Sequence, residues 1–185
     1  MIGSLRGTVL EVHVAYFLLE VGGVGYMVKA AGSLLSSLTA GEERFFYIHD
    51  HIREDAHDVF GFLSTGELEM FERLLSVNGV GPKVALTMLS IGSLDTVRRA
   101  ITNGDLSTLT SVPGVGKKTA QKIILDLKGK LVEEEGLVAG DGEVVEALVS
   151  LGYSAQVARE ILKTVPASIV DVSARVREAL KYLAK

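Results

Sequence analysis

The chain contains no cysteine and no tryptophan, and only three of its 185 residues are proline. The absence of cysteine excludes a disulfide framework and a thiolate metal site, and it fits a reducing compartment. Aromatic residues make up only 6% of the chain, so platforms for stacking single-stranded bases are scarce. No apolar run approaches the roughly 20 residues that cross a bilayer, and no basic start precedes an apolar segment. We therefore expect a cytoplasmic protein without a membrane span or signal peptide.

The charge is low overall but is unevenly distributed along the chain. Hydrophobic residues make up 48%, which is ample for a core, and the net charge is −4. Residues 1–63 carry a net charge of −4, residues 64–131 carry +3, and residues 132–185 carry −3. A basic middle segment thus lies between two acidic flanks. Such an asymmetry indicates a binding function better than the total does.

Residues 1–63 have the pattern of a small β-barrel. Runs rich in Val, Ile, Leu, Tyr and Phe alternate with glycine-bearing turns at Gly22–Gly23, Gly25 and Gly41. The expected strands are 2–12, 16–21, 26–30, 44–51 and 59–62. Five short strands in about 60 residues favour a Greek-key barrel of OB type, with an SH3-like barrel as the alternative.

The rest of the chain has helical periodicity. Residues 64–131 begin with a capping box at Ser64 and Glu67, and Asn103–Gly104 predicts a helix end. Residues 132–142 are acidic and contain glycine, so we interpret them as a linker. Residues 143–185 predict three short helices. The expected fold is therefore multidomain α+β: an OB-like barrel, a central all-α domain and a C-terminal three-helix bundle.

A repeat with an offset of 35 residues lies in the basic segment. The identical pairs are Leu74/Leu109, Val77/Val112, Gly79/Gly114, Val80/Val115, Gly81/Gly116, Lys83/Lys118 and Ala85/Ala120. Each copy reads as an apolar helix, a Gly-Val-Gly turn and a lysine-bearing second helix. Glycine permits the tight turn, and the unpaired N–H groups at the start of the second helix form an anion site. A backbone-lined seat of this kind suits a phosphodiester.

The Gly-Val-Gly pattern also allows other interpretations. A single copy could be mere packing between two helices. A Rossmann or P-loop site is poorly matched, because neither copy follows a strand and Ser111 stands where a P-loop has its first glycine. Two copies with matched lysines in the one basic segment favour phosphate binding.

The repeat resembles the helix-hairpin-helix motif, which binds the DNA backbone without reading sequence. Further segments resemble the RuvA family, the Holliday-junction-binding subunits of bacterial branch-migration complexes, over nearly the whole chain. These segments are MIGSLRGTVLE at 1–11, EVGGVGY at 20–26, REDAHDVFGF at 53–62, NGVGPK at 78–83, PGVGKKT at 113–119 and VSLGY at 149–153. The linker before the last domain is short for the family, which bears on the reach of that domain.

The resemblance implies a function and a set of domains. These are an OB-like barrel at 1–63, a tandem helix-hairpin-helix domain at 64–131, a linker at 132–142 and a motor-binding domain at 143–185. The implied function is structure-specific binding of four-way junction DNA and recruitment of the RuvB motor in recombination, repair and the SOS response to DNA damage. The expected DNA-binding residues are Asn78, Gly79, Val80, Gly81, Lys83, Gly114, Val115, Gly116, Lys117 and Lys118. The family also implies a homotetramer, an octamer as a further form on DNA, and the RuvC resolvase as a partner.

Two smaller groups of residues receive a role from the same resemblance. Glu54 and Asp55 lie between the fourth and fifth expected strands and match the family's acidic pin. Sequence alone would favour a solvated turn there. Carboxylates at a strand-crossing point would repel phosphates and help to guide strands apart. Leu148, Leu151 and Tyr153 are expected to dock the motor, although a purely structural role in the core is the alternative.

The sequence has no pattern typical of catalysis. His49, His51, Asp55, His57 and Asp58 have no spacing that matches a known closed metal site, and no Walker motif is present. We therefore expect a non-catalytic subunit with no metal and no cofactor, whose partner hydrolyses ATP. Two alternatives stay open: an accessory subunit of a nuclease or replication complex, and a metal-dependent enzyme that uses the histidine cluster.

Overall fold

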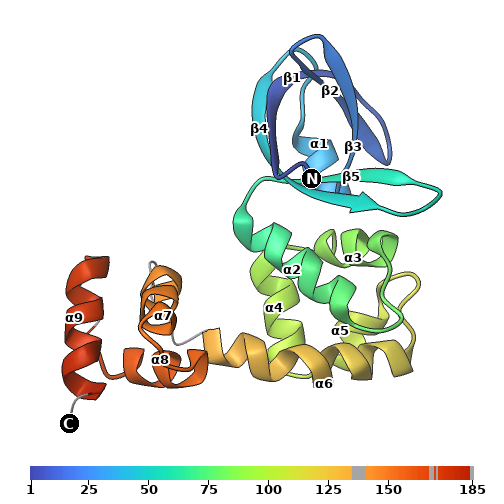
Figure 1. The fold of residues 1–185 in the computed structure, drawn as a ribbon. Coiled ribbons are helices and arrows are strands. Elements are labelled where there is room, and N and C mark those ends of the chain that lie inside the picture. The colour runs from blue at the N-terminus through green and yellow to red at the C-terminus, as the bar shows by residue number, and fades with distance from the viewer. Residues whose placement is uncertain (135–140, 167–168, 170, 184–185) are drawn as a thin grey trace. The chain divides into compact units, whose positions relative to one another are not determined.

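A computed structural model describes residues 1–134, 141–166, 169 and 171–183. The chain forms two compact units, Met1–Lys128 and Gly129–Lys185. The first unit contains the barrel and helices α1 to α5 with most of α6, and the described part of the second contains the end of α6 and helices α7 to α9 (Figure 1).

Five strands close the barrel in the order β1-β2-β3-β5-β4. They are β1 (Ser4–Val12), β2 (Tyr16–Val21), β3 (Val24–Lys29), β4 (Glu43–Ile52) and β5 (His57–Phe62). All neighbours are antiparallel except β3 and β5, which pair in parallel at Val28↔Val59 and Lys29↔Phe60. This crossover and closure are those of an OB-type barrel and remove the exposed sheet edges. The predicted OB-like fold is correct, and the SH3-like alternative is not.

Alternation of side chains places the barrel core. Phe17 and Leu19 on β2, and Phe46 and Ile48 on β4, point inward and are almost completely buried. The rings of Phe17 and Phe46 lie 4.7 Å apart between centroids. The intervening residues face outward, so strand period alone defines the inner face.

Two details of the barrel differ from the sequence-based expectation. Gly25 belongs to β3 and pairs with Glu20, because the two-residue turn at Gly22–Gly23 already joins β2 to β3 with positive φ at both positions. A short helix, α1 (Gly32–Ser37), follows β3 and was not predicted. Its Leu34 and Leu35 close one end of the barrel core.

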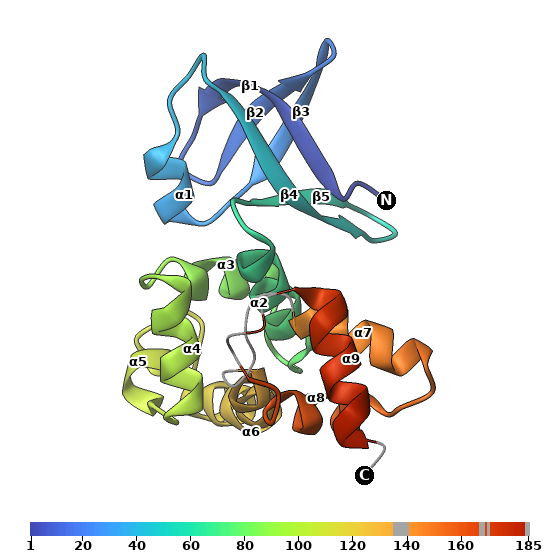
Figure 2. The same cartoon turned by 90° about the vertical axis from the view of Figure 1, so that its left-hand side faces the viewer.

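Five helices follow the barrel in the first unit. They are α2 (Thr65–Ser76), α3 (Pro82–Leu89), α4 (Leu94–Thr102), α5 (Leu106–Thr110) and α6 (Lys117–Glu134), whose last residues belong to the second unit. Figure 2 shows α2 to α5 as a compact helical layer next to β4 and β5. Phe71 of α2 joins the layers, because its ring packs against Phe60 and Phe62 of β5 with centroids 5.2 and 4.9 Å away.

The expected linker at 132–142 needs correction at both ends. Helix α6 extends through Glu134, and α7 begins at Asp141, so these ends are helical. Asp141, one of the acidic residues that indicated a linker, is buried in the second unit. Residues 135–140 lie outside the described part of the chain.

The second unit contains α7 (Asp141–Ser150), α8 (Ala155–Leu162) and α9 (Val172–Leu183). Gly152, with φ of +97°, ends α7, and Ser154 caps α8 by accepting a hydrogen bond from Val157 N. A buried ion pair joins α9 to α7: Arg175 Nε donates to Asp141 Oδ1 at 2.7 Å, and both side chains are 1% exposed. Arg175 also donates to the Ile169 carbonyl, so its charge is well compensated.

Among the helices that the structure describes, none combines the length and apolar character that a membrane crossing requires.

Candidate nucleic-acid interface

The first helix-turn-helix, α2–α3, carries the first Gly-Val-Gly. The capping box at its start forms as predicted: Ser64 Oγ accepts from Glu67 N, while Glu67 Oε2 accepts from Leu63 N. Gly79 has φ of +95°, and Val80 N donates to the Val77 carbonyl at 3.0 Å. This turn directs Val80 into the core and leaves the glycines at the surface.

The second helix-turn-helix, α5–α6, repeats this geometry. Gly114 has φ of +89°, Val115 N donates to the Val112 carbonyl at 3.0 Å, and Val115 is buried. Helix α5 has only five residues, and Asp105 caps it by accepting from the N–H and hydroxyl groups of Ser107 and Thr108. These hydrogen bonds, chiefly from the Thr108 hydroxyl, lower the pKa of Asp105 to about 2.

Both turns present the start of a helix to solvent. The first helical hydrogen bond of α3 runs from Ala85 N to the Gly81 carbonyl, and that of α6 from Ala120 N to the Gly116 carbonyl. The amides before those positions therefore point out of the helix end, where the positive end of the helix dipole favours an anion. Lys83, Lys117 and Lys118 lie exposed in these first turns. Each turn thus offers amide donors and cations to one phosphate.

The two turns lie side by side. A Cβ added at Gly114 would come within 3.3 Å of Val84 Cγ2 on α3. The glycine in the second hairpin therefore permits a close approach by the first. This contact brings together the expected DNA-binding residues of both copies, which are separated by 35 residues in the sequence.

The acidic pair Glu54 and Asp55 lies at the tip of the β4–β5 hairpin. Arg53 N donates to the Ala56 carbonyl at 2.8 Å and closes the loop, and both carboxylates are exposed. The structure thus places the pair on an exposed loop that projects from the barrel between β4 and β5.

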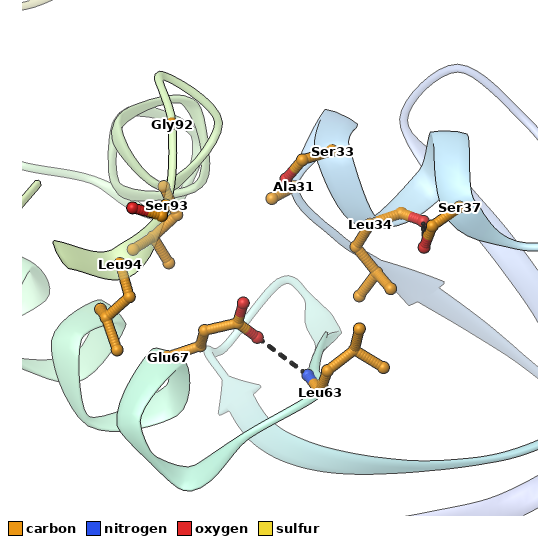
Figure 3. Close-up of a pocket in the computed structure, with 10 residues that line it drawn as sticks. Ala31, Ser33, Leu34, Ser37, Leu63, Glu67, Gly92, Ser93 and Leu94 are labelled. Atoms are coloured by element: carbon orange, nitrogen blue, oxygen red, sulfur yellow. Dashed lines mark hydrogen bonds between the residues drawn. The ribbon is translucent and has the colours of Figure 1, made fainter. Parts of the chain in front are cut away.

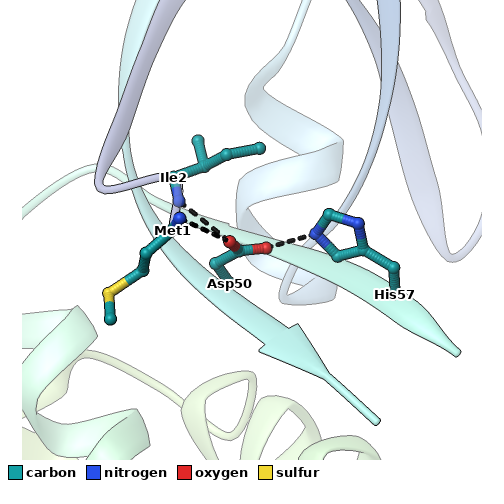
Figure 4. Close-up of polar contacts among 4 residues, drawn as sticks. All are labelled: Met1, Ile2, Asp50 and His57. Atoms are coloured by element: carbon teal, nitrogen blue, oxygen red, sulfur yellow. Dashed lines mark hydrogen bonds and ion pairs between the residues drawn. The ribbon is translucent and has the colours of Figure 1, made fainter. Parts of the chain in front are cut away.

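One face of the β4–β5 hairpin is anchored by a buried carboxylate. The side chain of Asp50 is 1% exposed and lies between the chain's N-terminus and the ring of His57 (Figure 4). Ile2 N donates to Asp50 Oδ2 at 2.9 Å, and His57 Nε2 shares a hydrogen bond with Oδ1. The hydrogen bond from His57 holds the pKa of Asp50 below its usual value, although burial acts in the opposite direction.

The other face of the same hairpin carries a second cluster that the sequence did not reveal. Asp58 Oδ1 accepts from Lys29 Nζ at 2.7 Å, and Asp58 Oδ2 lies 3.5 Å from Arg53 Nη2. The hydrogen bond from Lys29 is the main cause that lowers the pKa of Asp58. Lys29 and Asp58 meet because β3 and β5 pair in parallel, which no local pattern could have indicated.

The histidine cluster considered as a metal site separates into different contacts. His49 Nδ1 lies 3.0 Å from Glu72 Oε1 on α2, whereas His57 faces Asp50. Within the described residues, no group of three or more His, Asp or Glu side chains is arranged to hold a metal ion.

The junction between barrel and helices contains a cavity of about 320 Å³. Figure 3 shows Leu34 of α1 and Leu63 pointing toward one another across it, with Glu67 bonded to the Leu63 amide. Close by, Ser90 Oγ accepts a hydrogen bond from Gly32 N at 3.0 Å. These hydrogen bonds link Leu63 to α2, and the start of α1 to the end of α3.

In the second unit, the three residues expected to dock a motor have different environments. Leu148 is fully buried in the three-helix core, and Tyr153 packs partly against that core. Leu151 is 58% exposed. Leu148 is therefore a core residue in this fold, because the inner face of α7 packs against α8 and α9, and only Leu151 presents most of its side chain to solvent.

Comparison with protein families divides the chain into three matched segments. Residues 1–61 match the RuvA N terminal domain, residues 71–129 match the SAM-like helix-hairpin-helix tandem, and residues 142–184 match the RuvA C-terminal domain.

Similar full-length proteins occur in several bacteria, and each of the following is named Holliday junction branch migration complex subunit RuvA. The protein from Laribacter hongkongensis is 41% identical, and the match covers 100% of both chains. That from Bdellovibrio bacteriovorus is 44% identical over 91% of both chains, and that from Chloroflexus aurantiacus is 39% identical over 98% of both.

Proposed function

The chain belongs to the RuvA family, and from that premise we propose that it is the Holliday-junction-binding subunit of a branch-migration complex. The observation that carries the proposal is the pair of helical hairpins with matching geometry, which lie side by side in the basic segment. Because its substrate would be chromosomal DNA, we also propose a cytoplasmic location.

The hairpins would bind backbone phosphates of one duplex arm. Donors are the outward amides at the starts of α3 and α6, and the cations are Lys83, Lys117 and Lys118. The exposed groups of Asn78, Gly79, Gly81, Gly114 and Gly116 allow close approach of the DNA, while Val80 and Val115 anchor the turns from inside. Such contacts position DNA but read no base sequence. Specificity for a junction then has to come from geometry.

The exposed pair Glu54 and Asp55 would supply part of that geometry. Two carboxylates on a projecting loop repel phosphates and discourage a continuous duplex from lying across the loop. At a junction the strands diverge, so the loop can occupy the centre. Their predicted role as an acidic pin is therefore to tune junction preference and migration rate.

Assembly of several subunits would raise the affinity for the junction above that of one subunit. A homotetramer presents one pair of hairpins to each of the four arms, and the linked contacts raise the effective concentration of every further contact. Two tetramers could enclose the junction as an octamer. We propose that the second unit docks the RuvB motor through a surface that includes exposed Leu151, and that RuvC acts on the same junction. The chain itself would be non-catalytic, with ATP hydrolysis in the motor.

The test is binding of the full chain to matched four-way, linear duplex and single-stranded DNA, combined with native mass determination. We expect tightest binding to the four-way junction and four or eight subunits per junction. Substitution of Lys83, Lys117 or Lys118 by alanine should weaken binding irrespective of base sequence and reduce the log–log salt slope by about one per lost contact. Tightest binding to single strands would instead indicate an accessory subunit of a nuclease or replication complex.

The acidic pair has its own test. Replacing both Glu54 and Asp55 with Gln and Asn removes charge with little change of shape. We expect a smaller preference for junction over duplex and an altered migration rate with the motor present. An unchanged preference and rate would show that the pair is an ordinary solvated turn.

A further inference from the structure

A second cavity lies between the barrel and the first helical hairpin. It has a volume of about 400 Å³, and strands of the barrel, the β4–β5 loop and helix α3 contribute to its lining. Its lining includes Lys29, Arg53, Asp58, Phe60, Pro82 and Lys83. Strand β5 lies next to α3 in both views of the fold (Figures 1 and 2). None of Lys29, Arg53 and Asp58 belongs to a helix-hairpin-helix turn or to the acidic pair.

The cavity is rich in positive charge. Lys29, Arg53 and Lys83 bring three cations, against the single carboxylate of Asp58. Asp58 uses one oxygen for each of two cations, at 2.7 Å from Lys29 Nζ and 3.5 Å from Arg53 Nη2. Its side chain is 21% exposed, whereas those of Lys29 and Arg53 are 40% and 54% exposed. The Asp58 carboxylate thus pairs with both cations, and its side chain is less exposed than either of theirs.

The wall of the cavity is apolar. Phe60 is 2% exposed, and Lys29 Nζ lies over its ring, 5.9 Å from the centroid. Pro82 adds a second apolar surface. Cations beside a rigid apolar wall suit a ligand with a phosphate and a hydrophobic neighbour. A nucleotide unit of DNA has both, in its phosphodiester and its deoxyribose.

The position of the cavity indicates which part of the DNA would enter it. Lys83 belongs both to the cavity and to the first hairpin's phosphate seat, and Arg53 directly precedes the acidic pair Glu54 and Asp55. A strand that runs from the first hairpin toward the acidic pair therefore passes over the cavity. A duplex arm held only by the two hairpins need not do so.

We propose that this cavity binds the backbone of the junction strand where it leaves its duplex arm for the crossover, with Lys29 and Arg53 as phosphate ligands and Asp58 as the residue that positions them. This inference rests on the proposed function. In this role Asp58 does more than repel DNA phosphates. Asp58 weakens the overall attraction for DNA but aims two cations at one phosphate.

The first experiment compares Lys29→Gln and Arg53→Gln with a matched control, Arg44→Gln. Arg44 lies at the opposite end of β4, is 38% exposed and pairs with Glu42 at 3.2 Å, so its setting resembles that of Lys29. Fluorescence anisotropy gives the Kd for a four-way junction and for a linear duplex. We expect each cavity variant to lose about tenfold affinity for the junction and less than about twofold for the duplex. The control should keep both affinities and the native mass.

The second experiment locates the contact on the DNA. Neutral methylphosphonate linkages replace single phosphates, one at a time, from each arm to the crossover. The wild-type chain should lose affinity at one linkage next to the crossover, and Lys29→Gln should lose no further affinity there, because the partner of the lysine is already absent. Additive losses at that linkage would contradict the proposal.

Asp58→Asn separates positioning from repulsion. If Asp58 positions the cations, its removal should raise affinity for duplex, lower the preference for the junction and abolish the effect of the critical linkage. If Asp58 only repels phosphates, affinity for both DNAs should rise equally and the linkage effect should persist.

The two levels of the proposal fail in different ways. A wild-type chain that binds junction no better than duplex, or that is insensitive to Lys117→Ala and Lys118→Ala, overturns the proposed function. A chain that prefers the junction, but keeps its full preference in Lys29→Gln and Arg53→Gln, overturns only the cavity site.

Discussion

The two helical hairpins have the same turn in different surroundings. Gly79 and Gly114 have φ of +95° and +89°, and Val80 and Val115 are both buried. Around Gly79 a Cβ would meet open space, whereas at Gly114 it would press on Val84. The first hairpin has Lys83 and borders the basic cavity, while the second has adjacent Lys117 and Lys118. The two hairpins thus share the geometry of the turn and differ in the packing and the charged residues around it.

The largest expected difference between the hairpins concerns charge. Lys117→Ala combined with Lys118→Ala should weaken junction binding by about a hundredfold, since each charged contact with phosphate contributes roughly 1.5 kcal/mol. Lys83→Ala should cost about tenfold. Titrations with junction DNA at several salt concentrations measure both, and the conservative Lys→Arg changes should retain affinity. If Lys83→Ala alone weakened junction binding as much as the double variant, the first hairpin would contribute more to binding than expected.

A second difference concerns the turn glycines. Gly79→Ala should destabilise the chain by about 1 kcal/mol, because a side chain is unfavourable at positive φ. Gly114→Ala should cost about 2 kcal/mol, since it adds the contact with Val84 Cγ2 at 3.3 Å. Urea unfolding followed by circular dichroism measures these losses. Combining Gly114→Ala with Val84→Ala should recover part of the stability lost in Gly114→Ala. If no stability is recovered, the contact between Gly114 and Val84 does not cause the extra loss.

The caps at the starts of the two hairpins give a smaller effect. Ser64 caps α2, and Ser64→Ala should lower stability by about 1 kcal/mol through loss of the hydrogen bond from Glu67 N. The loss should be the same at pH 6 and at pH 3, because a hydroxyl does not titrate in this range. Ser64→Asp, which keeps an acceptor, should retain most of the stability at pH 6.

The cap of the second hairpin should respond to acid. The pKa of Asp105 is about 2 in the folded chain, below the ordinary value near 3.8. Its contribution is therefore fully present above pH 4 and is lost as the pH falls toward 2. Wild-type stability should decline over this range more steeply than that of Asp105→Ser. Parallel declines, measured by thermal unfolding at stepped pH, would contradict this assignment.

Local patterns predicted much of the fold and of the hairpins. The Gly-Val-Gly repeat predicted both turns, Pro82 begins α3 as its type favours, and Ser64 caps α2. The failures are equally specific. The sequence does not indicate helix α1, because Gly32–Ser37 is a six-residue segment with three serines and no helical period. Gly25 was read as part of a turn, although it pairs inside a strand.

Contacts between distant residues could not be predicted in this way. Asp50 receives Ile2 N from 48 positions earlier, and Lys29 meets Asp58 only because β3 and β5 are parallel neighbours. Leu148 has the same apolar character as Leu151, yet one is buried and the other exposed. Which apolar residue in or directly after a short helix faces its neighbours depends on how those neighbours pack.

The sequence by itself determined the two Gly-Val-Gly turns and the basic segment that contains them, because glycine conformation and helix capping act within a few residues. It also placed Glu54 and Asp55 between two strands. Only the tertiary structure decided that the barrel closes through a parallel pair, that Gly114 lies against Val84, and that Lys29, Arg53 and Asp58 gather beside Lys83. Those arrangements arise from chain closure and packing, which bring together residues that no short segment contains.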